Sequence, residues 1–206
     1  MLLILLTTCD IIQNITNSEK KEWKKKMKWL IASDIHGSYY YCEKLLERFK
    51  IEKADRLLLL GDVLYHGPRN DLPKDYAPKK VIALLNGMKD SIMCVRGNCD
   101  TEVDQMVLDF PVLADYAIIT FGERMIYATH GHNYNPEKLP PLKQGDALLY
   151  GHIHVPKCYL ENGILILNPG SVSIPKENSE HSYMLLEGNE LKWKNLDGKE
   201  YNSYTL

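Results

Sequence analysis

The sequence predicts a layered α/β domain, and three of its features support that fold class. From Met27 onward, short apolar runs alternate with helical stretches and polar turns, as in strands and helices stacked in layers. After Asp109 the apolar runs become shorter and follow one another without helices, which indicates a β-rich second half. The length of 206 residues, with 45% hydrophobic and 25% charged residues, suits one globular domain.

The first half is expected to contain three strands and two helices. Residues 29–33 (WLIAS) and 57–61 (LLLLG) are apolar runs that end in small residues, as strands buried on both faces do. The helix between them presents an apolar stripe with helical spacing, formed by Cys42, Leu45, Leu46 and Phe49. A second helix is expected over residues 79–86, and a third strand within residues 91–96 (SIMCVR).

The second half is expected to form strands separated by turns rich in Gly, Asn, Pro and acidic residues. These strands are expected at residues 116–121, 124–129, 147–151, 157–161, 164–168, 182–187 and 190–195. Hairpin turns are expected at residues 121–123, 161–163 and 187–190, because each separates two such runs. Two sheets packed together and flanked by helices are the simplest arrangement of these elements.

Residues 1–26 precede this pattern and are treated separately from a single domain at residues 27–206. Their start, MLLILLTTC, matches a lipoprotein signal poorly, because no Lys or Arg precedes an apolar run of only about six residues. Such a run is also too short to span a membrane. We interpret Met27 as the natural start, with residues 1–26 as upstream sequence or a mobile arm.

The net charge and the cysteine pattern narrow the classes of partner and compartment. A net charge of −2 gives no long-range attraction for a polyanion, so we expect no stable nucleic-acid complex. The five cysteines form neither a CxxC pair nor a disulfide-rich spacing, which suits a reducing compartment. We therefore expect a cytoplasmic protein without a membrane partner, and the sequence leaves the formation of a homo-oligomer open.

Polar residues that can bind metals recur where apolar runs end. In chain order they are Asp34 with His36, Asp62, Asn98, His130, and His152 with His154. Because ligands bind at the carboxyl ends of strands in α/β sheets, these loops are expected to converge on one crevice.

The composition of this set indicates the kind of metal. Two carboxylates, one amide oxygen and four imidazoles, with no required thiolate, favour Mn(II), Fe, Co or Zn at higher coordination over a tetrahedral structural zinc. Seven ligands exceed what one ion takes, and a carboxylate such as Asp62 can bridge two ions about 3.5 to 4 Å apart. A single Asp-x-His after a strand is more often a turn or a helix N-cap. The recurrence of residues that can bind metals at five strand ends favours the metal site.

These motifs resemble those of a known family. The segments SDIHGS, GDVLYHGPRN, GNCDTEVDQM, THGH, YGHIH and NPGSVS look like those of the calcineurin-like metallophosphoesterases, and closely like their YfcE-type bacterial phosphodiesterases. The resemblance implies a four-layer αββα sandwich and an enzyme that hydrolyses small phosphodiesters by attack of a metal-bridging hydroxide. It also implies two divalent ions, with Mn(II) expected and Fe, Co, Ni or Zn as alternatives.

By matching positions, the resemblance assigns residues to each ion. One ion would be held by Asp34, His36, Asp62 and His154, and the other by Asp62, Asn98, His130 and His152. Catalytic roles are expected for Asp62, Asn98 and Cys99. The broad family usually has histidine where this sequence has Cys99, thought to protonate or stabilise the leaving group. Because a neutral thiol is a poorer proton donor, substrates with good leaving groups are expected to react best.

Other residues are expected near the substrate or behind the ligands. His66, Cys99 and His132 are candidates for substrate contact, and His66 could instead act as the missing acid. The alternatives are an exposed loop histidine for His66 and a loop cap for His132. Asp100 is expected to orient a ligand, and Asn168 of NPGS is a candidate for the same task. Arg69 suits bidentate phosphate contact but is more often a solvated loop charge.

Two rival functions remain open at this point. A similar fold serves as a protein-interaction scaffold in a retromer subunit that has lost ligand positions, whereas this sequence retains all seven. A polynucleotide nuclease of similar fold would be expected to carry a basic groove or a capping domain, which this composition does not indicate. Metal-stimulated hydrolysis of an aryl phosphodiester would separate the enzyme from the scaffold.

Overall fold

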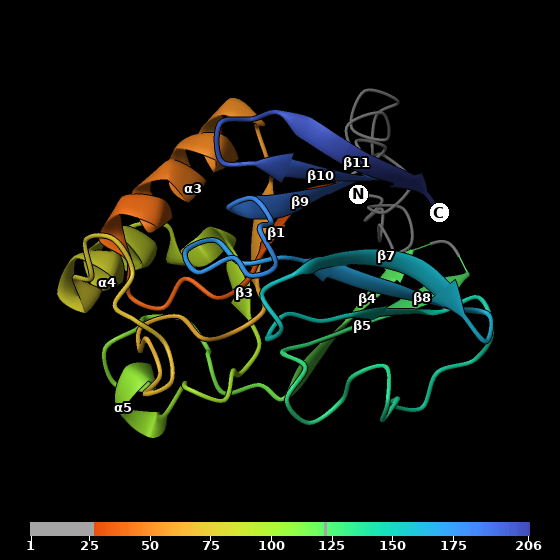
Figure 1. Ribbon diagram of the computed structural model, residues 1–206, viewed down its shortest axis with the longest axis horizontal. Coiled ribbons are helices and arrows are strands. Elements are labelled where there is room, and N and C mark those ends of the chain that lie inside the picture. The colour runs from red at the N-terminus through yellow and green to blue at the C-terminus, as the bar shows by residue number, and fades with distance from the viewer. Residues whose placement is uncertain (1–26, 122) are drawn as a thin grey trace, which may run out of the picture.

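The computed structural model describes residues 27–121 and 123–206, which form two β-sheets with helices on one outer side (Figure 1). One sheet has the strand order β11-β10-β9-β1-β2-β3 and is called here the helix-covered sheet. The other has the order β4-β5-β6-β8-β7 and is called the loop-covered sheet. The prediction of two packed sheets is confirmed, and the expected extension at residues 1–26 lies outside the described residues.

The helix-covered sheet is parallel in one half and antiparallel in the other. Its strands are β1 (Lys28–Ala32), β2 (Arg56–Leu59), β3 (Ile92–Cys94), β9 (Ser182–Glu187), β10 (Glu190–Asn195) and β11 (Glu200–Thr205). The first three run parallel, and β9 joins β1 antiparallel. The sequence did not predict β11, because the exposed edge strand has no buried apolar residue to mark it.

Two helices cover the outer face of this sheet, α3 (Tyr39–Ile51) and α4 (Pro78–Asn86). The hydroxyl of Ser38 caps α3 by accepting a hydrogen bond from the N–H of Tyr41. The predicted stripe of α3 is buried at Cys42, Leu45 and Leu46. The remaining helical elements are a short 3-10 turn (Lys89–Ser91) and α5 (Glu102–Gln105).

The loop-covered sheet has a parallel centre and antiparallel edges. Its strands are β4 (Tyr116–Phe121), β5 (Arg124–Thr129), β6 (Ala147–Leu149), β7 (Pro156–Glu161) and β8 (Ile164–Pro169). β5, β6 and β8 are parallel, whereas β4 pairs with β5 and β7 pairs with β8 as antiparallel hairpins. These two hairpins, together with β9 and β10, confirm the three predicted turns, except that Gly122 is not described.

The layers on the two outer sides are different. Between the sheets, Trp193 is fully buried among apolar residues of both sheets. On the outer face of the loop-covered sheet, the irregular segment 131–146 packs Tyr134 and Leu142 against a cluster that contains Leu148 and Ile166. In the described part of the chain, the fourth layer of the expected sandwich is therefore a loop rather than a helix (Figure 1).

The parallel strands bring the expected site residues to one edge of the sandwich. Backbone hydrogen bonds join the loops that follow them, from Asp34 N–H to the Gly61 carbonyl and from Gly151 N–H to the His130 carbonyl. Across the two sheets, His152 N–H donates to Asp34 Oδ2 at 3.1 Å.

Among the described residues, no helix has both the length and the apolar character needed to cross a bilayer.

Candidate metal centre and substrate cleft

The structure brings together all seven residues that the sequence singles out as metal ligands. They lie just beyond the carboxyl ends of β1, β2, β3, β5 and β6. Two groups of them have ligand atoms within 4.8 Å of one another: Asp34, His36 and His154, and Asp62, His130 and His152. Asn98 lies beside the second group, with its Oδ1 3.0 Å from His130 Nε2.

The first group presents unprotonated nitrogen atoms toward one point. The Nδ1 atoms of His36 and His154 lie 2.7 Å from the carbonyl oxygens of Tyr65 and Ile174, so each Nδ1 carries the proton. In the neutral imidazoles the Nε2 atoms are then acceptors, and they face each other at 3.3 Å. Two lone pairs at this distance are satisfied by a cation placed against both.

Asp34 supplies an oxygen to the same point. Its Oδ2 accepts a hydrogen bond from His152 N–H, whereas its Oδ1 is buried without any hydrogen-bond partner. That Oδ1 lies 3.2 Å from His154 Nε2 and 3.6 Å from His36 Nε2. Since a buried carboxylate oxygen without a partner is costly, a metal ion fits these residues.

The second group has the same construction around Asp62. His130 donates its Nδ1 proton to the Leu60 carbonyl at 2.6 Å, which leaves Nε2 facing His152 Nδ1 at 3.1 Å. Asp62 Oδ1 accepts the N–H of Cys99, and Oδ2 lies 3.4 Å from His130 Nε2 and 3.8 Å from His36 Nε2. Asp62 Oδ2 is thus positioned between the two groups.

Five of these seven residues have a left-handed backbone conformation. They are Asp34, His36, Asp62, His152 and His154, with φ between 48° and 68°. For residues other than glycine this conformation costs about 1 to 3 kcal/mol each and persists only where the surroundings enforce it. The concentration of such residues at one place is typical of a functional site.

The NPGSVS segment enforces the conformation at Asp34. The hydroxyls of Ser171 and Ser173 both donate to the Asp34 carbonyl, at 3.1 and 3.0 Å. Asn168, fully buried at the end of β8, donates from Nδ2 to the Gly151 carbonyl at 2.8 Å and accepts from Gly170 N–H. Asn168 therefore holds the residue that precedes His152.

Asp100 and Gly97 have a corresponding role beside Asp62. The Asp100 carboxylate accepts the N–H groups of Asp62, Val63 and Gly97 at 2.7 to 2.9 Å, so it orients the backbone of a candidate ligand rather than an imidazole. A Cβ at Gly97 would clash with the backbone nitrogen and side chain of Asp62. Glycine is needed there for space rather than for a positive φ.

The electrostatics of the site favour positive charge beside the carboxylates. Burial raises the pKa values of Asp34 and Asp62, but the neighbouring imidazoles outweigh burial and hold both pKa values below their ordinary value. Burial lowers the pKa of His130, but Asp62 and Asp34 raise it to about 9. A proton on His130 and a divalent cation would satisfy the same carboxylates.

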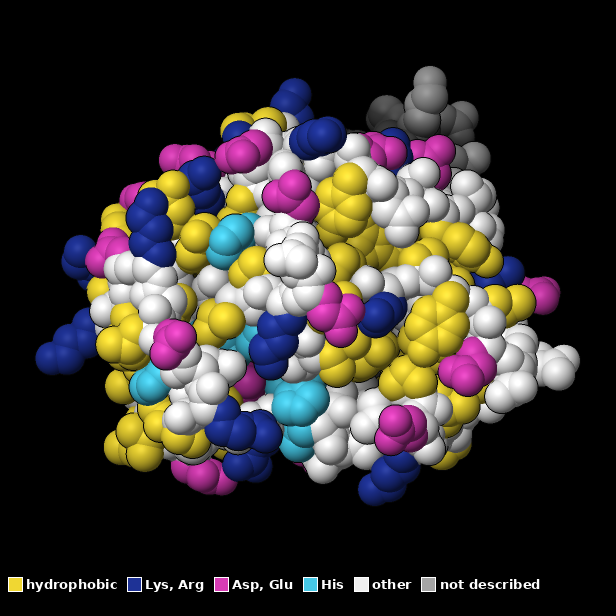
Figure 2. All heavy atoms as spheres, in the orientation of Figure 1, with side chains coloured by type: hydrophobic (Ala, Val, Ile, Leu, Met, Phe, Trp, Pro, Cys, Tyr) yellow, Lys and Arg dark blue, Asp and Glu magenta, His cyan; other side chains and the backbone are white. Residues whose placement is uncertain are grey.

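A cleft of about 480 Å³ opens over these groups. Figure 2 shows histidines near the centre of the face that the reader sees, next to Lys and Arg side chains. Its walls include His36, Asp62, Asn98, Cys99, His152 and His154, with Arg69, Asn70 and Lys176 at the exposed side. The sequence analysis did not single out Lys176, which comes from an exposed loop without a motif of its own.

Cys99 lies in the wall of this cleft. Burial and the negative charge of Asp62 raise the pKa of its thiol, which is therefore neutral at physiological pH. Its Sγ accepts a hydrogen bond from Asn98 Nδ2 at 3.2 Å, which turns the Asn98 Oδ1 toward His130.

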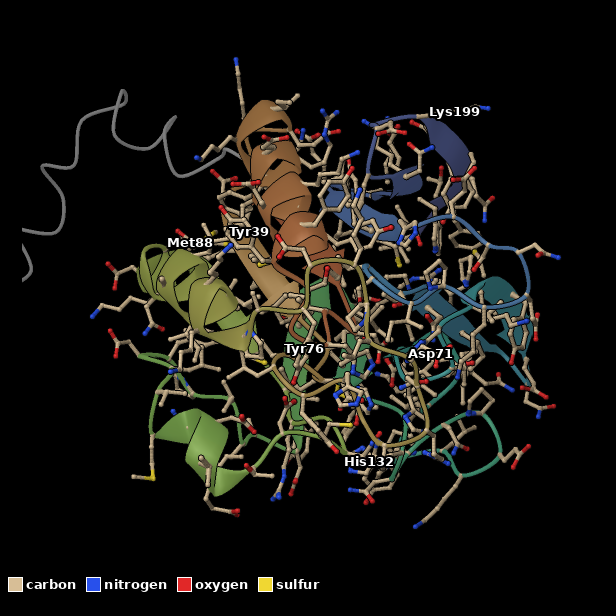
Figure 3. The ribbon with its side chains drawn as sticks, turned by 60° about the vertical axis from the view of Figure 1, so that its left-hand side comes forward. Tyr39, Asp71, Tyr76, Met88, His132 and Lys199 are labelled. Atoms are coloured by element: carbon tan, nitrogen blue, oxygen red, sulfur yellow. The ribbon has the colours of Figure 1, made fainter. Side chains whose placement is uncertain are left out.

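His66 and His132 lie outside the walls of this cleft. The His66 ring packs edge-on against Tyr65 and Tyr76, with its Nδ1 buried and unpartnered. The His132 ring lies 5.4 Å from that of His130, and burial lowers its pKa. In Figure 3, Tyr76 lies near the centre of the view, His132 near its lower edge, and Asp71 to the right of Tyr76. His132 is thus near a candidate ligand, and His66 is near other aromatic rings.

Comparison with known proteins identifies what this chain resembles. Residues 27–190 match the calcineurin-like phosphoesterase superfamily domain. Phosphodiesterase YfcE of Escherichia coli K12 is 48% identical over 165 residues, which cover 80% of this chain and 90% of YfcE.

Solved structures show the same relationship. The structure of YfcE, described as a phosphoesterase from E. coli, has a TM-score of 0.84 and 46% identity, and the match covers 87% of this chain and 99% of that one. The structure of Vacuolar Protein Sorting 29 from Cryptosporidium parvum shares the fold, with a TM-score of 0.60 and 22% identity over 89% of this chain and all (100%) of that one.

Proposed function

The chain belongs to the calcineurin-like phosphoesterase superfamily, and from that premise we propose that it hydrolyses small phosphodiesters with the help of two divalent cations. The observation that carries the proposal is the buried Asp34 Oδ1 without a partner, beside imidazole lone pairs that face one another. The name phosphodiesterase, given to a relative with 48% identity, supports the reaction class.

The seven residues would share the two cations through Asp62. Asp34, His36 and His154 would hold one, His130, His152 and Asn98 the other, and Asp62 Oδ2 lies between the two sets. When bound, the cations would supply Lewis acidity and a water of lowered pKa for attack on phosphorus. Mn(II) suits this mixture of oxygen and imidazole ligands, with Fe, Co, Ni or Zn as alternatives.

The remaining cleft residues act on the substrate and on the ligands. Arg69 and Lys176, both exposed at the cleft wall, would attract the diester anion and neutralise its non-bridging oxygens. The N–H of Cys99 fixes Asp62 Oδ1. Because the Cys99 thiol is neutral and a weak acid, the departing alkoxide receives little help, which favours esters of acidic alcohols and phenols.

Two further proposals follow from the sequence. We propose that residues 27–206 form the single catalytic domain and that the enzyme works in the cytoplasm, since its cysteines suggest a reducing compartment. The net charge of −2 argues against long polynucleotides as substrates.

The test is a panel of esters with metal-free protein prepared by chelation. We expect Mn(II) to restore hydrolysis of bis(para-nitrophenyl) phosphate, with para-nitrophenyl phosphate and single-stranded DNA reacting poorly. Metal analysis of protein purified without chelator would identify the native ion. Hydrolysis that is equally fast without any metal would contradict the proposal.

The scaffold alternative rests on the shared fold of Vacuolar Protein Sorting 29. Against it stands the convergence of all seven candidate ligands in this chain, which a scaffold does not require. Absence of metal-stimulated turnover with any ester of the panel would favour the scaffold.

A further inference from the structure

A second hollow adjoins the metal cleft on the side of the loop-covered sheet. It has a volume of about 480 Å³, within the range of small-molecule sites. His152 and Ile153 line both the cleft and this hollow, so the two meet at one ridge. The other walls include Tyr150, Tyr159, Glu137 and Glu161.

The walls of the hollow combine aromatic rings with carboxylates. Tyr159 is 39% exposed, and Tyr150 packs deeper at the end of β6. Because the ordinary pKa of a tyrosine phenol is about 10, both rings are neutral at physiological pH.

The two carboxylates are available to a ligand. Glu137 and Glu161 are both exposed, and neither forms an ion pair within the described parts of the chain. Nor does any described Lys or Arg line the hollow. Carboxylates and aromatic faces both attract cations, so the hollow disfavours a further phosphate and favours positive charge.

The metal cleft has the opposite character at its exposed side. Arg69 and Lys176 line the cleft, although only the ridge formed by His152 and Ile153 separates the cleft from the hollow. On the face shown in Figure 2, Lys and Arg side chains lie beside the central histidines on their left, and hydrophobic, acidic and basic side chains lie farther to their right. A substrate that spans the ridge would meet basic groups on one side and acidic ones on the other.

We propose that the hollow lined by Tyr150, Tyr159, Glu137 and Glu161 binds an ammonium-bearing arm of the diester substrate. The inference rests on the proposed function and narrows its substrate class to diesters of an amino alcohol. The phosphate occupies the metal cleft, and the ammonium group lies across the His152 ridge, against the tyrosine rings and between the carboxylates.

The test compares two diesters with the same leaving group and the same shape. One is para-nitrophenyl phosphocholine, and the other is neohexyl para-nitrophenyl phosphate, in which a carbon atom replaces the charged nitrogen. We expect kcat/KM of the Mn(II)-loaded enzyme to favour the choline ester by about tenfold. The preference should shrink as the salt concentration rises.

Removing the two carboxylate charges of the hollow tests their role, and removing two carboxylate charges elsewhere is the matched control. In the Glu137→Gln/Glu161→Gln double variant the preference should fall to about one, with hydrolysis of bis(para-nitrophenyl) phosphate unchanged. A Glu47→Gln/Glu123→Gln variant removes the same charge from exposed positions elsewhere and should keep the preference.

The outcomes separate the two proposals. An enzyme that hydrolyses bis(para-nitrophenyl) phosphate but shows no preference between the matched esters overturns the ammonium subsite alone. An equal loss of preference in the control variant also overturns it, because the effect would then come from net charge. Failure to hydrolyse any of the three esters overturns the proposed function and with it the subsite.

Discussion

The two sheets bring chemically different groups to the candidate metal centre. The loops of the helix-covered sheet supply every oxygen donor, namely Asp34, Asp62 and Asn98, and one imidazole, His36. The loops of the loop-covered sheet supply imidazoles only, His130, His152 and His154. The three imidazoles of the loop-covered sheet thus meet the carboxylates where the two sheets face each other.

This difference predicts that a bound metal would join the two sheets. In each candidate group a carboxylate from one sheet lies against imidazoles from the other, as with Asp34 and His154 at 3.2 Å or Asp62 and His130 at 3.4 Å. Ligands that bind only the folded state stabilise it, so cations should raise the melting temperature as well as activity.

Removing the central oxygen donor should have the largest effect. In Asp62→Ala we expect loss of bound metal and a fall in kcat/KM of at least about a thousandfold, because the shared anion between the two groups is gone. Metal content by mass spectrometry, the rise in melting temperature on adding Mn(II), and hydrolysis of bis(para-nitrophenyl) phosphate measure this.

Asp146→Asn is the matched control for that variant. Asp146 is a buried carboxylate that accepts the N–H groups of Met125 and Lys143, away from the centre. It should retain metal and activity. Normal metal content in Asp62→Ala would contradict the assignment of Asp62 as the shared ligand.

The next variant places a second imidazole beside His36 on the helix-covered sheet, which supplies the oxygen donors. It should change which leaving groups the enzyme accepts. In Cys99→His we expect hydrolysis of diphenyl phosphate, which has a poorer leaving group, to rise about a hundredfold relative to bis(para-nitrophenyl) phosphate. The reason is that an imidazole can protonate the leaving group, whereas burial and Asp62 keep the thiol protonated. Cys99→Ala is the control. If Cys99→His hydrolyses diphenyl phosphate no faster than Cys99→Ala does, a residue at this position does not act as the acid for the leaving group.

Loosening the support of one candidate ligand within the loop-covered sheet should have a smaller effect. Asn168→Ala removes the amide that holds the Gly151 carbonyl, so His152 loses its fixed position, and we expect metal affinity and kcat/KM to fall about tenfold. Titration against a chelator measures the affinity. Asn86→Ala removes an amide that likewise bridges two backbone groups, at Val107 and Asp109, and should leave both quantities unchanged.

The smallest effect is expected for Glu52, which follows α3 and is hydrogen-bonded to strands of the helix-covered sheet, away from the candidate ligands. Burial raises the pKa of Glu52, but hydrogen bonds from Lys194 at 2.6 Å and Tyr183 at 2.9 Å outweigh it and lower the pKa below 4.5. The pKa of Glu52 is lower in the folded state than in the unfolded state. Its contribution to the free energy of unfolding is therefore fully present above pH 4.5 and is lost as the pH falls through the folded-state pKa.

Denaturant unfolding across that range tests the point. Glu52→Gln should lower the free energy of unfolding by about 1 to 2 kcal/mol at neutral pH and by less in acid, with metal binding unaffected. Glu190→Gln, at an exposed carboxylate that pairs with Lys192, should change it little at any pH. Equal destabilisation by Glu52→Gln at all pH values would show that the charge is not responsible.

The sequence predicted most of the elements and all the residues that the centre brings together. Apolar runs marked each strand that is buried on at least one face, and the ends of those runs marked the candidate ligands. It failed where burial leaves no pattern, as in the exposed strand β11. It could not reveal that a loop at residues 131–146 replaces the fourth helical layer, because that segment contains both apolar and turn residues.

The sequence by itself determined which groups are available at the strand ends, because residue type and position after an apolar run are local properties. Only the tertiary structure decided how they are used. The left-handed backbone at Asp34 and the protonation of His36 at Nδ1 depend on carbonyl and hydroxyl partners in other loops. Likewise, the packing of His66 against Tyr76 and the position of Lys176 at the cleft result from contacts between distant segments, which no local pattern encodes.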